Sequence, residues 1–411
     1  MKQTRELGDN AAADRIVVSS SARPDRAIVM RHLVDVTMFW SATGGGVRRY
    51  LLRKRAALRG PTAWRQTIVA PGASGFGLVD CGGVPLPRSG GYRLTLRRAH
   101  AARLIAEQRP DLIEVGDPYR LAWAALDAAQ RLGIPALAFC HSNLSAMVAR
   151  LAGAAARPAR RLAQAYLRRV YRSFDRVLAP SAAMAAALLE MGIDNVDQQP
   201  LGVDSRVYHP GRRNCALRAT WRTEFGLPAD ARLLLYAGRF APEKNLPVLV
   251  DAIERLGSPY YLLAIGDGPL PPRGRCVRIM SYETSEEQLA TIYASADGFV
   301  HAGDQETFGL SVLEAMASGT PVVVRAAAGL AELVDHGAGI GVPTADTDEW
   351  ATAIASLFDS QRQTRIRLAR ARAESLDWRR VIPEVLARYE CLLSGTQYPL
   401  IRQREREIVA A

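Results

Sequence analysis

The chain contains 411 residues with a formal net charge of +12, and 48% of its residues are hydrophobic and 23% charged. This length exceeds what a single hydrophobic core usually serves, so we expect two domains. No apolar run reaches the roughly 20 residues of a membrane-spanning helix, and the start of the chain lacks the apolar core of a signal peptide. Five cysteines without CxxC spacing argue against a disulfide framework and a zinc site, and they predict a cytoplasmic protein.

The positive charge lies in the first half of the chain. Residues 1–200 hold 29 Lys and Arg against 15 Asp and Glu, whereas residues 201–411 hold 24 against 26. A basic half predicts an anionic partner, which can be a nucleic acid, a membrane surface or a phosphorylated substrate. We disfavour the nucleic acid, because no recognised binding module or aromatic platform accompanies the arginines.

Short runs of β-branched residues alternate with helical stretches, which is the pattern of parallel α/β domains. In the first half, strands are predicted at 33–38, 66–69, 112–115, 136–139, 176–178 and 196–199. In the second half, strands are predicted at 232–236, 260–265, 277–280, 298–301 and 321–324, and helices at 346–358, 361–374 and 377–394. We therefore expect two doubly wound Rossmann-like domains that face a central cleft, where the ligands of such sheets bind.

The domain boundaries are predicted from breaks in this pattern. Residues 1–29 are polar and are expected to be a disordered extension. An N-terminal domain over 30–200 and a C-terminal domain over 215–376 are separated by a hinge at 201–214 that contains Pro and Gly. A last helix at 377–394 precedes a tail at 395–411.

Two glutamates mark the stretch "GDQETFGLSVLEAMASG" at 303–319, which predicts a helix beginning near Phe308. The helix is apolar on all sides except at Glu314, and a buried carboxylate needs a partner. A pair of ligand hydroxyls or an arginine of the neighbouring layer can serve. The free N–H groups at the helix start form an anion site, and Glu306 lies just before it.

Cations and glycines follow two other strands. Arg239 and Lys244 come after strand 232–236, where a guanidinium fork and an ammonium group suit a diphosphate. Three glycines, at 44–46, follow the first strand. They let the backbone approach a ligand, or they only make a tight turn.

Further polar residues stand at strand or helix ends. His141 ends strand 136–139 and faces the cleft, with a structural or a functional role. Asp117 either caps the next helix or contacts an acceptor. Asp346 and Asp348 match the short DxD signature of metal-dependent sugar transferases, but carboxylates are also favoured at the start of a helix, and we assign no metal to them.

Together these stretches resemble the retaining glycosyltransferases of the GT-B fold, glycosyltransferase family four. The resemblance covers about 33–393, and the E-x7-E element of Glu306 and Glu314 is its most specific motif. It implies that Glu306 contacts the donor sugar, that Glu314 holds the ribose hydroxyls, and that His141 lies under the anomeric carbon. One departure is His301-Ala302, where many members have Pro-Ser, and it leaves the surroundings of the donor sugar open.

The resemblance implies a full set of site residues. Catalytic roles fall on His141, Glu306, Arg239 and Lys244. Donor contacts fall on Gly44, Gly45, Gly46, Arg239, Lys244, Gly266, Met280, Glu306, Phe308, Gly309, Leu310, Ser311 and Glu314. Acceptor contacts are assigned to Asp117 and Tyr119. The implied reaction moves a hexose from a nucleoside diphosphate sugar to a hydroxyl with retention of configuration, and it needs neither a metal nor a cofactor, because the nucleotide sugar is a substrate. The final helix is implied to cross back onto the N-terminal domain.

The most basic stretch, 157–176, predicts an amphipathic helix. Its arginine face contains Arg157, Arg160, Arg161, Arg168 and Arg172, and the predicted apolar face contains Leu162, Ala163, Tyr166 and Val170. The arginine face is either simply solvated or adheres to anionic lipid. Since several relatives reach lipid acceptors through this domain, we expect a glycolipid-forming enzyme at the inner face of the membrane, with diacylglycerol as acceptor and a UDP-sugar as donor. A soluble or polysaccharide acceptor is the alternative.

Overall fold

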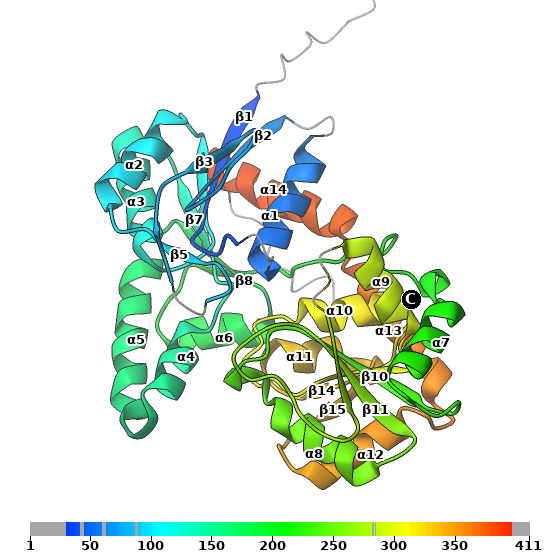
Figure 1. Cartoon of the computed structure of the whole chain (residues 1–411). Helices are drawn as coiled ribbons and strands as arrows, with labels where there is room; N and C mark the ends of the chain where they lie inside the picture. Colours follow the sequence, from blue (N-terminus) through cyan, green and yellow to red (C-terminus); the bar gives the residue numbers. More distant parts are fainter. Residues whose placement is uncertain are drawn as a thin grey trace, which may run out of the picture.

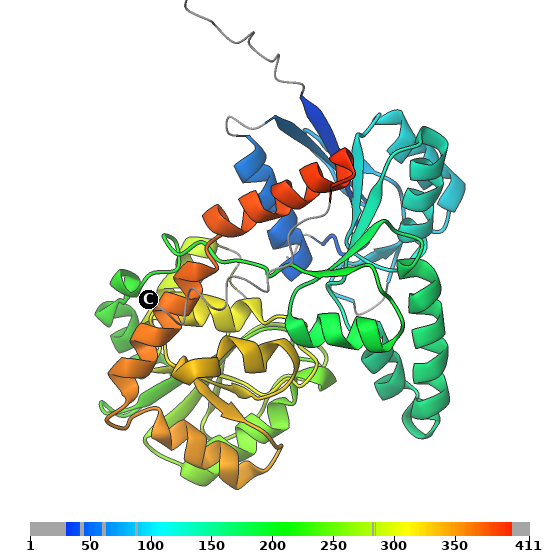
Figure 2. The same cartoon turned by 180° about the vertical axis from the view of Figure 1, so that it is seen from behind.

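The computed structural model describes residues 30–41, 45–59, 63–86, 89–281, 283 and 285–396. It contains two α/β halves, each built around a parallel sheet, as the views in Figures 1 and 2 show. The predicted extension at 1–29, the tail beyond residue 396 and Gly44 lie outside the described residues.

The first half is built on a seven-stranded sheet with strand order β3-β2-β1-β6-β7-β8-β9. Its strands are β1 (Arg31–Val36), β2 (Trp64–Ala70), β3 (Leu78–Asp80), β6 (Leu112–Val115), β7 (Ala136–Phe139), β8 (Arg176–Ala179) and β9 (Val196–Gln198). Its helices are α1 (Gly46–Leu58), α2 (Arg98–Glu107), α3 (Arg120–Leu132), α4 (Leu144–Leu151), α5 (Ala156–Tyr171) and α6 (Ala182–Glu190). A small antiparallel pair, β4 (Val84–Pro85) and β5 (Arg93–Leu94), follows β3.

The second half is built on a six-stranded sheet with strand order β12-β11-β10-β13-β14-β15. Its strands are β10 (Arg232–Ala237), β11 (Tyr260–Ile265), β12 (Val277–Met280), β13 (Gly298–His301), β14 (Val322–Arg325) and β15 (Ile340–Val342). Its helices are α7 (Cys215–Glu224), α8 (Leu246–Leu256), α9 (Glu286–Ser295), α10 (Leu310–Ala317), α11 (Ala328–Leu333), α12 (Thr347–Ser356) and α13 (Arg362–Ser375). The central strands are buried on both faces, as expected for a parallel sheet that is covered by helices.

The last helix, α14 (Trp378–Ser394), leaves the second half and lies against the first, beside α1 (Figure 2). The chain therefore passes between the halves twice. The two crossing segments pair with each other, because Val203 donates to the Leu376 carbonyl and accepts from the N–H of Trp378, both at 3.0 Å. We call this paired segment the neck.

The structure confirms the predicted doubly wound fold, the predicted strands and the returning last helix. Five predicted strands have the observed bounds, and the others differ by one or two residues at one or both ends. The short strands β3, β4, β5 and β15 were missed. In β15 the central residue is Gly341, and glycine removes the β-branched pattern that identifies a strand. Among the described residues, no helix is long and apolar enough to cross a membrane.

Candidate functional site

The site lies where the strand order reverses in each sheet. In the second half this switch point is between β10 and β13, and in the first half it is between β1 and β6. Loops that leave the carboxyl ends of such strands diverge to opposite faces and leave a crevice for ligands. Arg239 and Lys244 follow β10, Glu306 follows β13, the glycine loop follows β1 and Asp117 follows β6. The topology therefore brings together most of the residues predicted from sequence.

The second half contributes a cluster of Glu306, Lys244 and His301 to the centre of the candidate site. The Glu306 carboxylate accepts from the Lys244 ammonium, and it lies 3.3 Å from Nε2 of His301. Burial acts to raise the pKa of Glu306, but the Lys244 charge and the His301 hydrogen bond outweigh it and hold this pKa well below its ordinary value. Glu306 is therefore an anion at neutral pH. His301, at the departure from the family pattern, supports Glu306 directly.

Arg239 is the more exposed cation of this edge, with 56% of its side chain accessible. It pairs with Glu243 four residues later in the chain, so its guanidinium is held locally but stays open to solvent. Gly266 follows β11 and packs against the same loop, because a Cβ there would lie 1.9 Å from the Gly238 carbonyl oxygen. Met280 ends the edge strand β12 and is partly buried. Arg239, Gly266 and Met280 lie at the carboxyl ends of three neighbouring strands.

Helix α10 presents its N-terminus to the crevice. Gly309 precedes it with φ 99°, a left-handed conformation that favours glycine, and a Cβ there would lie 2.3 Å from Leu330 Cδ2. Leu310 and Ser311 form the first turn and are partly buried. Phe308 is only 5% exposed and belongs to the hydrophobic core.

Glu314 is the buried charge of α10, with 3% of its side chain exposed. Its carboxylate pairs with Arg49 of α1, which belongs to the other half of the molecule. Of the two partners considered from sequence, this structure therefore contains the arginine. That arginine comes from across the crevice rather than from a neighbouring layer of the same sheet.

The glycine loop approaches the second half closely. Gly45 has φ 125°, and a Cβ there would lie 2.8 Å from the Tyr92 hydroxyl. Gly46 begins α1, and its Cβ would come within 3.1 Å of Leu310 Cδ1. The absence of side chains thus lets the start of α1 lie against the start of α10.

His141 lies at the end of β7 and joins the two halves through its backbone. Its carbonyl accepts from the Thr307 hydroxyl at 3.0 Å, and its ring stacks on Phe139 with centroids 4.3 Å apart. Burial lowers the pKa of His141 to about 4, so the ring is neutral at pH 7. Nε2 of His141 and the Ser142 hydroxyl are both buried without a hydrogen-bond partner among the described residues. Ser142 was missed from sequence, since a single serine carries no pattern.

Asp117 has a structural role that differs from the predicted capping of the next helix. It accepts from the N–H of Met38 at 2.5 Å, from the Thr37 hydroxyl at 3.1 Å and from the N–H of Tyr119 at 3.2 Å. These bonds tie together the loops after β1 and β6. Burial raises its pKa to about 6, although those donors oppose the shift. The N-cap residue of α3 is Tyr119 and not Asp117, which corrects the capping alternative.

The DxD match is explained by helix capping. Asp346 is the N-cap of α12 and accepts from the N–H groups of Asp348 and Glu349. Asp348 pairs with Arg255 at 2.6 Å. Among the residues that the structure describes, no group of three His, Cys, Asp or Glu is arranged to hold a metal ion.

The basic helix is α5, and its arginine face is exposed. Arg157, Arg160 and Arg161 reach solvent, whereas Arg168 donates to the Met191 carbonyl and Arg172 pairs with Asp194. One part of the prediction was wrong. Leu162 is 75% exposed and does not share the buried face of Ala163 and Val170.

Comparisons with known proteins agree with this geometry. The family model "Glycosyltransferase Family 4" matches residues 44–207, and "Glycosyl transferases group 1" matches residues 231–360. A GDP-mannose-dependent alpha-mannosyltransferase of Mycobacterium tuberculosis is 32% identical over 290 residues, which is 69% of this chain and 73% of that protein.

Two further similarities extend over more of the chain. A GDP-mannose-dependent alpha-(1-6)-phosphatidylinositol dimannoside mannosyltransferase of M. tuberculosis is 28% identical over 384 residues, covering 89% of this chain and 97% of that protein. A sucrose-phosphate synthase structure from Thermosynechococcus elongatus superposes with a TM-score of 0.70 at 20% identity, covering 89% of this chain and all of the other. The chain therefore belongs to glycosyltransferase family 4, the group 1 glycosyl transferases of GT-B fold, and it is a hexosyltransferase that uses a nucleotide sugar.

Proposed function

We propose that the chain transfers a hexose from a nucleoside diphosphate sugar to a lipid hydroxyl, with retention of anomeric configuration. The observation that carries this proposal is the polar cluster at the two switch points. Lys244 and Arg239 supply positive charge beside the N-terminus of α10, and an anionic Glu306 lies between Lys244 and His301. This combination suits a sugar on Glu306 and a diphosphate on the cations and helix N–H groups.

The proposed chemistry follows from those charges. As the glycosidic bond to the diphosphate breaks, negative charge grows on the leaving oxygens, and Arg239 and Lys244 stabilise it. A neutral His141 faces the sugar without adding a third positive charge. The leaving phosphate takes the proton of the acceptor hydroxyl on the same face, which retains the configuration. We propose no metal and no cofactor for this step.

For the donor we propose GDP-mannose, with a UDP-sugar as the second candidate. Five relatives with long matches are named GDP-mannose-dependent mannosyltransferases, which supports the first choice. The test is a thermal-shift series with GDP-mannose, UDP-glucose and ADP-glucose on the wild type and on Glu306→Gln. We expect one donor to raise the wild-type Tm and to act more weakly on the variant. If no donor stabilises the wild type, the proposed site is wrong.

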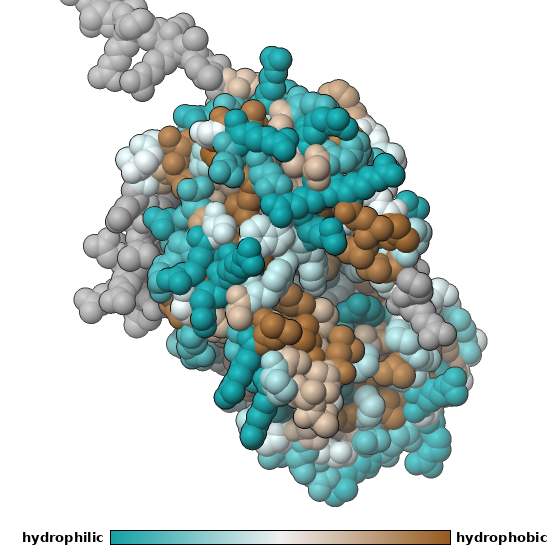
Figure 3. Space-filling view, turned by 90° about the vertical axis from the view of Figure 1, so that its left-hand side faces the viewer, coloured by the Kyte–Doolittle hydropathy of each residue, from teal (hydrophilic) through white to brown (hydrophobic). Residues whose placement is uncertain are grey.

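A lipid acceptor is supported by the surface of the helical pair α4 and α5. Met147, Leu151 and Leu162 are 43%, 81% and 75% exposed on these helices, and α5 adds the free arginines of its exposed face. Apolar and hydrophilic groups lie side by side on this face of the molecule (Figure 3). Leucines can enter the headgroup region while each arginine adds on the order of 1 kcal/mol of attraction to anionic lipid. One relative that covers most of the chain is named a phosphatidylinositol dimannoside mannosyltransferase, and this name contains a lipid.

Sedimentation with vesicles tests the membrane part. We expect the wild type to bind vesicles of anionic lipid at low salt and to bind neutral vesicles weakly. Leu151→Ser combined with Leu162→Ser is expected to abolish most binding. Leu368→Ser, which changes a leucine that is 41% exposed on α13 in the other half, is the matched control and is expected to bind as the wild type does. Equal binding by all three proteins would contradict the membrane contact.

A further inference from the structure

The carboxylate assigned to the donor ribose is already occupied in the ligand-free chain. Glu314 is 3% exposed, whereas its partner Arg49 is 34% exposed. Arg49 belongs to α1 of the first half and reaches Glu314 of α10 from across the crevice, so its guanidinium covers the carboxylate from the crevice side. A ligand that is to reach Glu314 must move this guanidinium.

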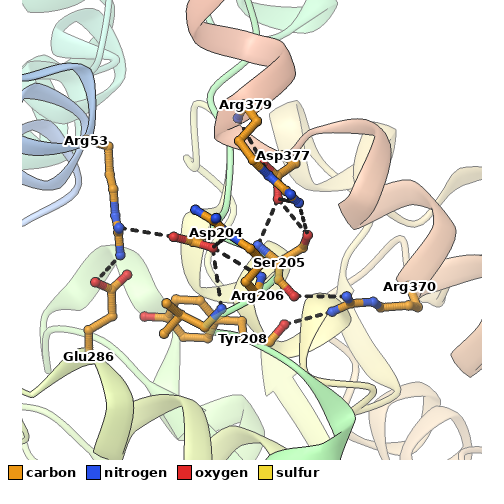
Figure 4. Close-up of polar contacts among 10 residues, drawn as sticks. Arg53, Asp204, Ser205, Arg206, Tyr208, Glu286, Arg370, Asp377 and Arg379 are labelled. Atoms are coloured by element: carbon orange, nitrogen blue, oxygen red, sulfur yellow. Dashed lines mark hydrogen bonds and ion pairs between the residues drawn. The ribbon is translucent and has the colours of Figure 1, made fainter. Parts of the chain in front are cut away.

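Arg49 belongs to a row of residues on one face of α1 that lies against the second half. Gly46, Arg49 and Arg53 are spaced three and four residues apart, which places them on one helix face. Gly46 lies against Leu310, Arg49 pairs with Glu314, and Arg53 pairs with Glu286 at the start of α9. Arg53 also contacts Asp204 beside the neck at 3.2 Å (Figure 4). Two ion pairs therefore join α1 to the second half, and only one of them uses a proposed donor residue.

A guanidinium and a vicinal diol satisfy a carboxylate in the same way, because each presents two donor hydrogens to its oxygens. A buried carboxylate without either partner is costly. We propose that Arg49 is an internal occupant of the ribose subsite, which neutralises Glu314 until the donor ribose displaces it. This inference rests on the proposed role of Glu314, and it means that donor binding breaks an ion pair between the two halves.

The consequence is a lower apparent affinity for the donor in the wild type, since the ligand competes with a group that is tethered to α1. Removing the guanidinium takes away the competitor and leaves Glu314 unpaired, and both effects favour a ribose. The same substitution removes one restraint on the crevice. A substitution at Arg53 removes a restraint of the same kind without changing the surroundings of Glu314. It therefore shows how much the lost restraint alone changes the affinity.

The experiment measures dissociation constants by calorimetry for the wild type, Arg49→Gln and Arg53→Gln. The probes are guanosine and GDP, or uridine and UDP if the wild type prefers them. We expect Arg49→Gln to bind the nucleoside about tenfold more tightly than the wild type, which corresponds to about 1.4 kcal/mol. Arg53→Gln is expected to stay within about twofold of the wild type. Arg49→Lys, which keeps the charge but loses the planar fork, is expected to lie between the wild type and Arg49→Gln.

Each other outcome overturns a defined statement. Equal tightening by Arg49→Gln and Arg53→Gln would mean that a looser crevice, and not competition, sets the affinity. Weaker nucleoside binding by Arg49→Gln would mean that Arg49 itself binds the ligand. If the wild type binds no nucleoside and no nucleoside diphosphate, the proposed donor site is wrong, and the proposed role of Arg49 is wrong as well. If Arg49→Gln does not fold, a nucleoside affinity of Arg49→Lys equal to that of the wild type overturns the proposal.

Discussion

Lys54 is the most deeply buried cation among the described residues, and its replacement by methionine is expected to be severely destabilising. The side chain is 0% exposed. Nζ donates to Asp35 at 2.6 Å, to Glu114 at 2.8 Å and to the Tyr389 hydroxyl of α14 at 3.0 Å. Both carboxylates are 1% exposed, so methionine leaves two buried carboxyl groups that must lose their cation and either stay charged or take up protons. Breaking a buried pair in this way costs about 3–5 kcal/mol.

The size of this loss is expected to depend on pH in a defined direction. Burial already raises the pKa of Asp35, against the opposing Lys54 charge, and the Glu114 charge raises it further. Without Lys54 the pKa values of both carboxylates rise, so the folded variant holds protons that the unfolded chain has released. A folded-state pKa above the unfolded value means that stability falls as pH rises. The deficit of Lys54→Met relative to the wild type is therefore larger at pH 8 than at pH 5.5.

The assay is urea denaturation at the two pH values, with hydrogen exchange of β1 and β6 as the local readout. Arg59→Met, at the exposed end of the same helix, is the control and is expected to change stability by less than about 0.5 kcal/mol. A loss below about 1 kcal/mol for Lys54→Met, or an equal loss at both pH values, would refute the buried-charge reasoning.

Three further outcomes are expected. Lys244→Gln should lower kcat with the donor by about 10²–10³-fold, because one of two cations on the leaving diphosphate is lost, and an unchanged kcat would remove Lys244 from the chemistry. His141→Gln should reduce the loss of stability on acidification between pH 6.5 and pH 4. The native pKa of His141 is about 4, so in the wild type the unfolded chain binds the proton at a higher pH than the folded chain does. Equal slopes of stability against pH for the wild type and the variant would contradict this. Gly309→Ala should cost at least about 1 kcal/mol and weaken donor binding, since the left-handed backbone and the Leu330 contact both exclude a Cβ, and a wild-type Tm would show that the loop adapts.

The sequence was informative where a pattern is local. Strand runs such as 136–139 and 260–265 were identified with their observed bounds because apolar residues are continuous there. Glu314 was identified as a charge that needs a partner, but its partner Arg49 could not be found, because their contact is created by two halves meeting across the crevice. The same limit applies to Lys54. In the run Arg53-Lys54-Arg55 its neighbours look alike, and contacts with β1, β6 and α14 make one of the three fully buried.

The neck has a consequence for how the crevice can open. The two crossing segments are joined by backbone bonds at Val203, and Asp377 accepts from both the N–H and the hydroxyl of Ser205, at 3.0 and 2.6 Å (Figure 4). Two chain segments fastened side by side resist sliding and twisting but still allow bending about the line between them. The two halves should therefore rotate relative to each other about the neck, which acts as a hinge. The largest displacement is then expected at the crevice edge farthest from Ser205. The last helix, which lies beyond the second crossing and packs against α1, would move together with the first half.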